Sequence, residues 1–228
     1  MRAPSLILLL ALFFAGCQNA ATDSQEEASE ENGEEPAMSY TLTPFSQSAQ
    51  FPTANLSNMA FANGTFTFDV ENYELKAQTP DAGQKMCANS EDGQHIHLIV
   101  DTQPYAAKYE STFEYEIADG EHYILAFLSR SYHESLKHPE ARIAQKVTVS
   151  GNSIVNEQDI TQPMLFYSRP KGTYVGNAQT EKVMLDFYLL NTDLSADGYR
   201  VQADINGETY LIDEWQPYYI EGLPMGDN

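Results

Sequence analysis

Short runs of alternating apolar and polar residues, separated by turn dipeptides, constrain the fold of this chain more than any other feature. These runs lie at residues 65–70, 95–101, 122–128, 146–149, 182–190 and 199–205. Two of them, 122–128 and 182–190, are almost continuously apolar, which is typical of strands buried on both faces. Asn-Gly and Asp-Gly dipeptides separate many of the runs, as tight turns between strands require. The pattern predicts an all-β protein built as β-sandwiches, with a single helical turn at 139–142.

An internal repeat extends this prediction to two domains. Residues 92–105 align without a gap on residues 197–210, and the turns, the strand and the closing tyrosine coincide. We therefore predict tandem sandwiches, the first at residues 40–160 and the second at residues 161–228. In the first copy the strand at 122–128 follows the repeat, whereas the sequence ends where its counterpart would begin. The second sandwich is thus expected to lack its last strand, either because the chain is a fragment or because it leaves an open edge for a partner.

The N-terminal residues predict export and lipid attachment. A short positive start precedes an apolar run that is shorter than the roughly 20 residues needed to span a bilayer, and the run ends at Ala15-Gly16 before Cys17. Residues 1–16 are therefore predicted to be a signal peptide. The Ala-Gly-Cys ending resembles the lipobox of bacterial lipoproteins. That resemblance implies that Cys17 becomes an acylated N-terminus anchored in a bacterial membrane, with the outer membrane favoured; an ordinary cleaved signal is the alternative.

Residues 17–39 are predicted to be the lipidated cysteine followed by a disordered acidic linker. The segment contains acidic residues, no basic residue and no aromatic residue, so it cannot bury enough apolar surface to offset the entropy of ordering. Acidic stretches soon after a lipidated cysteine resemble the surface-export signals of some Bacteroidota lipoproteins. This resemblance implies a location on the outer face of the cell envelope.

Charge and cysteine content narrow the range of partners. The 228 residues carry a formal net charge of −21, from 12 basic and 33 acidic residues. Nucleic-acid binding needs clustered basic residues that contact phosphates, and an anionic membrane surface repels such a chain. We therefore expect no nucleic-acid partner and attachment to the membrane through lipid alone. With Cys17 acylated, Cys87 has no disulfide partner and is predicted to be a buried thiol.

The histidines are the strongest candidates for a binding site. Residues two apart on a strand share a face, so His95 and His97 should project together. If the strand at 122–128 lies beside theirs, His122 and His133 can join them, and neutral imidazole is a common ligand of zinc and copper. The second copy has Arg200 and Gln202 at the matching positions, so this candidate metal site would belong to the first domain. Histidines hydrogen-bonded to turns, or simply exposed, are the alternatives.

These histidines also carry a resemblance to a known family. The residues concerned are 93–101, 119–125, His133 and His138. They resemble an uncharacterised extracytoplasmic bacterial domain with a Gly-x-His-x-His-Leu strand, and the whole chain resembles Bacteroidota lipoproteins sometimes labelled phosphopeptide-binding. The resemblance implies an immunoglobulin-like sandwich without an established activity. Arg130, Lys137 and Arg142 are too few and too scattered to predict a phosphate pocket.

We expect a lipid-anchored envelope binding protein rather than an enzyme. His133 and His138 are five residues apart, whereas the zinc-protease motif needs four, and no Gly-x-Ser-x-Gly elbow is present. The expected ligand is a metal ion, zinc or copper, or another envelope protein. A metal-assisted enzyme, which would need a general base beside the metal, and a purely structural or adhesion module are the alternatives.

Overall fold

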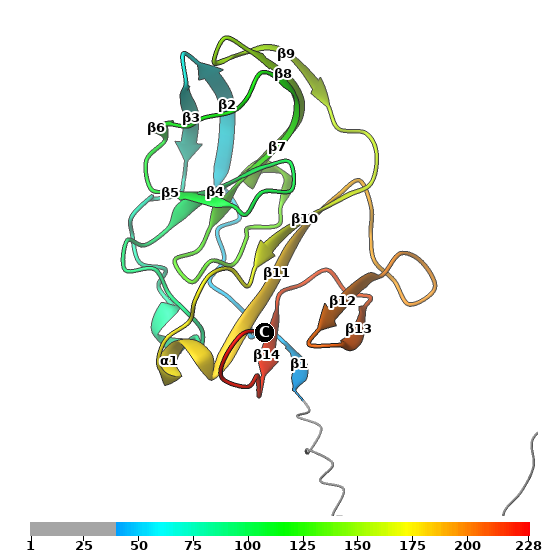
Figure 1. Cartoon of the computed structure of the whole chain (residues 1–228). Coiled ribbons are helices and arrows are strands. Elements are labelled where there is room, and N and C mark those ends of the chain that lie inside the picture. The colour runs from blue at the N-terminus through cyan, green and yellow to red at the C-terminus, as the bar shows by residue number, and fades with distance from the viewer. Residues whose placement is uncertain (1–39) are drawn as a thin grey trace, which may run out of the picture. The chain divides into compact units, whose positions relative to one another are not determined.

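Antiparallel strands make up nearly all of the regular structure in residues 40–228, the part of the chain that the computed structural model describes (Figure 1). The strands are β1 (Thr41–Pro44), β2 (Asn55–Ala62), β3 (Thr65–Glu71), β4 (His95–Val100), β5 (Ala106–Lys108), β6 (Thr112–Glu114), β7 (Gly120–Ser129), β8 (Arg142–Ser150), β9 (Ser153–Asp159), β10 (Met164–Arg169), β11 (Lys182–Leu190), β12 (Val201–Ile205), β13 (Glu208–Ile212) and β14 (Tyr218–Glu221). The helical elements are the short turns η1 (Ala82–Gln84), η2 (Pro139–Ala141) and α1 (Asn177–Thr180). The all-β prediction is confirmed, and the turn predicted at 139–142 is η2.

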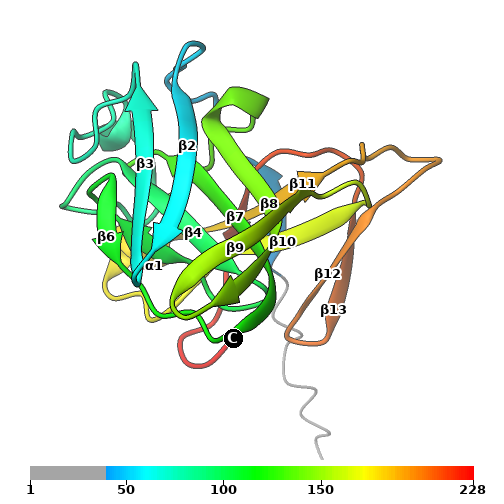
Figure 2. The same cartoon turned by 90° about the horizontal axis from the view of Figure 1, so that it is seen from above.

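Four sheets form the fold. Their strand orders are β2-β3-β6, β5-β4-β7-β8-β9, β1-β14-β11-β10 and β12-β13. Three hydrophobic clusters lie between successive sheets in this order. Figure 2 shows the β2-β3-β6 sheet and the β12-β13 hairpin on opposite sides of the two larger sheets. The sheets are therefore stacked in layers.

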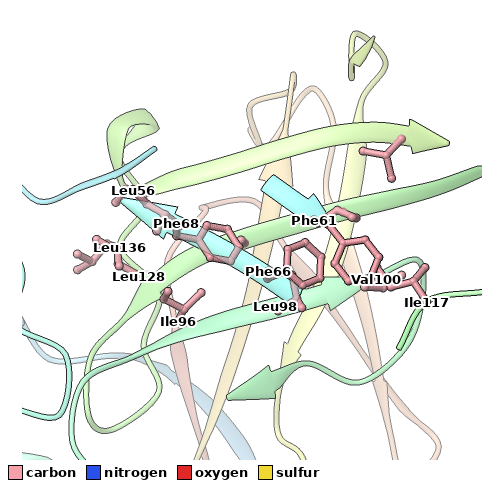
Figure 3. Close-up of a cluster of buried hydrophobic side chains, with 14 of the residues drawn as sticks. Leu56, Phe61, Phe66, Phe68, Ile96, Leu98, Val100, Ile117, Leu128 and Leu136 are labelled. Carbon is pink, nitrogen blue, oxygen red and sulfur yellow. The ribbon is translucent and has the colours of Figure 1, made fainter. Parts of the chain in front are cut away.

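The first cluster fills the space between the β2-β3-β6 sheet and the five-stranded sheet. Phe66 of β3 is fully buried and packs with Leu98 of β4, while Phe61, Phe68 and Val100 surround them (Figure 3). Alternate residues of β4 and β7 supply this face because successive side chains on a strand point to opposite sides.

The opposite face of the five-stranded sheet packs against β10 and β11. Leu125 and Phe127 of β7 contact the cluster that includes Phe166 of β10 and Tyr188 of β11. The far face of β11 in turn packs against the β12-β13 hairpin. Strands β7 and β11 are thus covered on both faces, which explains why their sequences are continuously apolar.

The predicted boundary at residue 160 is crossed by both strand pairing and core packing. Strand β1, which was placed in the first sandwich, pairs with β14, and one hydrophobic cluster contains residues from both sides of the boundary. The described residues belong to one compact unit. A tandem pair of equivalent sandwiches is therefore not shown.

The two copies of the internal repeat have different surroundings. Strand β4 lies between β5 and β7 and is buried along its whole length, whereas β12 pairs with β13 alone in the part of the chain that the structure describes. An edge of β12 is therefore unpaired there.

The predicted signal peptide (1–16), the lipidation site Cys17 and the acidic linker (17–39) lie outside the described residues. Within residues 40–228, no helix has the length and apolar character needed to cross a bilayer. Cys87 is a buried free thiol with 5% of its surface exposed, as predicted. Burial raises the pKa of this thiol to about 12.

Candidate functional site

Strand β4 presents His95 and His97 on the face that is directed toward β10 and β11. The intervening Ile96 belongs to the opposite cluster between the first two sheets, so the two imidazoles share a face as the spacing predicts. Both side chains are fully buried. A pair of histidines in a closed space between sheets must satisfy its ring nitrogens with protein groups or with a ligand.

The turn before β4 holds His95 in one orientation. The Nδ1 atom of His95 lies 2.8 Å from the carbonyl oxygen of Gly93. Gly93 has φ +84°, and a Cβ atom there would lie 2.3 Å from the carbonyl oxygen of Lys76. Only glycine fits this position, which gives the Gly-x-His spacing of the sequence a structural reason.

His133 reaches the same place from the turn that follows β7. The backbone N–H of His133 donates to the carbonyl of Arg130 over 2.8 Å, and the backbone N–H of Arg130 donates to the carbonyl of Glu134 over 2.9 Å. His133 itself has φ +71°, a left-handed conformation that is unfavourable for a residue with a Cβ. The turn therefore holds a strained backbone that brings this imidazole against β4.

Three ring nitrogens converge. His95 Nε2 lies 2.8 Å from His97 Nε2 and 3.1 Å from His133 Nδ1. All three ligand atoms lie within 4.8 Å of one another, and no other His, Cys, Asp or Glu in residues 40–228 joins the group. We refer to His95, His97 and His133 as the histidine cluster.

His122 and His138, the other two histidines, lie elsewhere. Strand β7 does lie beside β4, as the metal prediction required. The strands are antiparallel, however, and His122 lies at the end of β7 near Asp101, opposite the end that faces His95. Its Nδ1 and Nε2 atoms contact Asp101 Oδ2 at 2.7 Å and the Ala118 carbonyl at 2.9 Å. His138 Nε2 lies 3.0 Å from the Ala54 carbonyl. The cluster thus contains three of the four predicted ligands and leaves out His122.

Strand β10 contributes groups that the sequence did not single out. The β10-β11 register shifts between Tyr167 and Arg169, so Ser168 and Arg169 are both buried, as a β-bulge allows. Ser168 Oγ lies 3.2 Å from His97 Nδ1. The site is therefore built from both sides of the predicted domain boundary, and not from the first domain alone.

Tyrosines close the site and connect Arg169 to it. The ring of Tyr105 stacks on His97 with a centroid distance of 3.7 Å, and the ring of Tyr109 lies 5.0 Å from that of His95. Arg169 Nη1 donates to the Tyr105 hydroxyl over 2.8 Å, and this hydroxyl lies 3.5 Å from His133 Nδ1. Tyr105 was the closing residue of the internal repeat, but nothing in the sequence linked it or Arg169 to the histidines.

Burial keeps the three imidazoles neutral. It lowers the pKa of His95 to about 4 and that of His133 to about 2, and it holds the pKa of His97 well below its ordinary value. The positive charge of Arg169 acts in the same direction on all three. Neutral imidazole is the form that binds metal ions.

One lone pair, that of His95 Nε2, faces two neighbouring ring nitrogens. The Gly93 carbonyl can only accept, so His95 Nδ1 carries the proton and His95 Nε2 has the single lone pair of a neutral ring. Both His97 Nε2 and His133 Nδ1 lie at hydrogen-bond distance from that one lone pair. A cation at the centre would accept three lone pairs at once, with His95 Nδ1–H donating to Gly93 and His97 Nδ1–H donating to Ser168, as second-shell groups of metal sites do.

The distances fit a metal ion after a small expansion. Zinc–nitrogen bonds of about 2.0–2.1 Å place tetrahedral ligand atoms about 3.4 Å apart, whereas His95 Nε2 lies 2.8 and 3.1 Å from the ring nitrogens of His97 and His133. An outward movement of a few tenths of an ångström would accommodate the ion. Three imidazoles leave a fourth tetrahedral position for another ligand.

A scan against protein-family models, a search of curated proteins and a search of solved structures each found no match for this chain.

Proposed function

We propose that this chain is a lipid-anchored protein of the bacterial cell envelope that binds one zinc or copper ion through His95, His97 and His133. The observation that carries the proposal is the convergence of three neutral ring nitrogens, two from the fully buried His95 and His97 and one from the half-buried His133. Imidazole ligands suit both metals. The strongly acidic chain also attracts cations to its surface.

Binding is favoured over catalysis in this proposal. An enzyme that activates metal-bound water needs a general base within hydrogen-bond reach. In residues 40–228, the hydrogen bonds of the three imidazoles go to Gly93, Ser168, Tyr105 and one another, and none goes to a carboxylate. These contacts support metal binding as the proposed role.

Titration of the purified full chain with Zn²⁺ and with Cu²⁺ tests the metal site. The proposal expects one ion per chain, and expects His95→Gln, His97→Gln and His133→Gln each to weaken binding by about 100-fold or more. His122→Gln and His138→Gln are matched controls, because these imidazoles lie outside the cluster, and they should bind like the unmodified protein. Equal losses in the controls, or no loss in the cluster variants, would refute the metal proposal.

Lipid attachment is tested separately. Mass spectrometry of the N-terminal peptide should find acylated Cys17 and no preceding residue, and Cys17→Ser should move the protein from the membrane fraction to the soluble fraction. An intact Met1 in protein recovered from cytosol would contradict the envelope location without affecting the metal site.

A further inference from the structure

Arg169 differs from the other cations in residues 40–228 whose side chains are almost fully buried. The side chains of Lys85 and Arg130 are 2% and 6% exposed, and they lie within ion-pair distance of Asp81 and Glu134, both at 3.4 Å. Arg169 is only 5% exposed, yet it forms no ion pair within residues 40–228. Its Nε atom is also buried without a hydrogen-bond partner. The guanidinium carbon lies 5.4 Å from the centre of the Tyr174 ring, but an aromatic ring carries no net charge. A buried charge without a counter-ion is unfavourable, and an anion would compensate it.

The unpaired guanidinium lies beside the histidine cluster. Arg169 Nη1 donates to the Tyr105 hydroxyl, and the same hydroxyl lies 3.5 Å from His133 Nδ1. One phenol oxygen therefore separates the guanidinium from a nitrogen of the proposed metal site. A second cation is close by, because Lys171 Nζ donates to the Tyr105 carbonyl and lies 4.4 Å from the centre of the Tyr105 ring.

This charge distribution is unfavourable for a bare divalent ion. The three imidazoles are neutral and therefore offset none of the metal charge, while Arg169 and Lys171 add positive charge to the same region. An anionic ligand in the fourth coordination position would compensate the metal and the guanidinium together. A carboxylate can do so because one oxygen would bind the metal while the other accepts charge-assisted hydrogen bonds from guanidinium N–H groups.

We infer that the metal held by His95, His97 and His133 binds together with a small carboxylate-type anion, and that Arg169 is the positioning residue for this anion. The inference rests on the proposed metal-binding function. It assigns the ligand of the open coordination position as a formate- or acetate-sized group, because Tyr105 and Ser168, which border the cluster, are themselves buried. The buried, unpartnered Arg169 Nε is the observation that points to the anion.

The test is zinc binding by the full chain, measured by calorimetry with and without added formate. Formate should raise the apparent zinc affinity of the unmodified protein by about tenfold. Arg169→Gln should retain zinc binding, at an equal or higher affinity without formate because a repulsive charge is removed, and should lose the enhancement by formate. If Arg169 had only a structural role, Arg169→Gln would instead lower the zinc affinity both with and without formate.

Three further variants complete the design. Arg169→Lys should restore part of the formate effect, and Arg200→Gln, which removes an exposed charge before β12, should behave like the unmodified protein. Zinc binding that does not respond to formate would overturn the anion inference and leave the metal proposal standing, whereas absence of zinc binding would overturn both. Loss of zinc binding in Tyr105→Phe would identify a phenolate as the fourth ligand and would also overturn the inference.

Discussion

The backbone of His133 is strained, and this strain is part of the free-energy cost of forming the histidine cluster. Its left-handed backbone, with φ +71°, is enforced by the turn after β7 and brings its Nδ1 to within 3.1 Å of His95 Nε2. Such conformations cost about 1–3 kcal/mol for residues with a Cβ. Strain of this kind persists where the surrounding structure requires it, and it often marks a functional position.

Two substitutions at this position separate strain from ligation. Both His133→Ala and His133→Gly remove a proposed metal ligand, so both should lose most of the metal affinity. Glycine also relieves the strained φ, so the metal-free glycine variant should be more stable than the alanine variant by about 1 kcal/mol. Urea unfolding of the two metal-free proteins measures this difference. Equal stability would show that the turn does not impose the conformation on residue 133.

The same residue predicts a pH dependence of stability. The pKa of His133 is about 2 in the folded protein, against about 6.5 in an unfolded chain. Below pH 6.5 the unfolded chain therefore binds a proton that the folded protein does not, and stability falls as the pH falls. Asparagine also tolerates positive φ, and His133→Asn should reduce this slope by about 1 kcal/mol per pH unit near pH 5. An unchanged slope in urea titrations of the metal-free variant would contradict the neutral assignment.

At the level of elements, the strands could be predicted and their register could not. The period-two runs identified the central strands, and the spacing of His95 and His97 gave their shared face correctly. Periodicity does not say which ends of two neighbouring strands meet. The antiparallel pairing of β4 with β7 places Ile124 opposite Val100, and His122 accordingly lies near Asp101, away from the cluster. The bulge that buries both Ser168 and Arg169 gave no signal in the sequence, because its cause is the pairing with β11.

The close packing of the turn before β4 can be tested by comparing Gly93 with Gly151, a glycine in another turn that also has positive φ. Gly93 and Gly151 both have positive φ, but a Cβ at Gly93 would overlap the Lys76 carbonyl, whereas nothing lies within 4 Å of one at Gly151. Gly151→Ala should cost about 1 kcal/mol, the strain of the conformation alone. Gly93→Ala should cost about 3 kcal/mol or more because the turn must also move. Chemical denaturation compares the two, and similar losses would argue against the close packing of this turn.

At the scale of the whole molecule, the sequence indicated layers of β-sheet but not how they are connected. Strand β1 is the first described strand of the chain, yet it pairs with β14, the last one. Local sequence patterns cannot reveal a contact between segments so far apart. The repeat suggested two equal units, yet β4 is central and β12 lies in a two-stranded hairpin. The sequence similarity between the two copies of the repeat reflects a shared turn–strand–turn pattern. Binding to a second envelope protein stays a prediction.

The shared layer between the two larger sheets predicts cooperative unfolding. Phe166 of β10 packs in the cluster that joins residues from both sides of residue 160. Phe166→Ala should destabilise the protein by about 3–5 kcal/mol and move one calorimetric transition as a whole. Two separate transitions, of which only one moves, would instead support independent tandem domains.

X-ray absorption spectroscopy of the zinc-loaded full chain tests the histidine cluster most directly, since it reports the ligands around the ion itself. We expect three imidazole ligands at about 2.0–2.1 Å and a loss of one imidazole in His133→Gly. His122→Gln should give the spectrum of the unmodified protein. Fewer than two imidazoles around the ion, or a spectrum that changes with His122 and not with His133, would contradict the site described here.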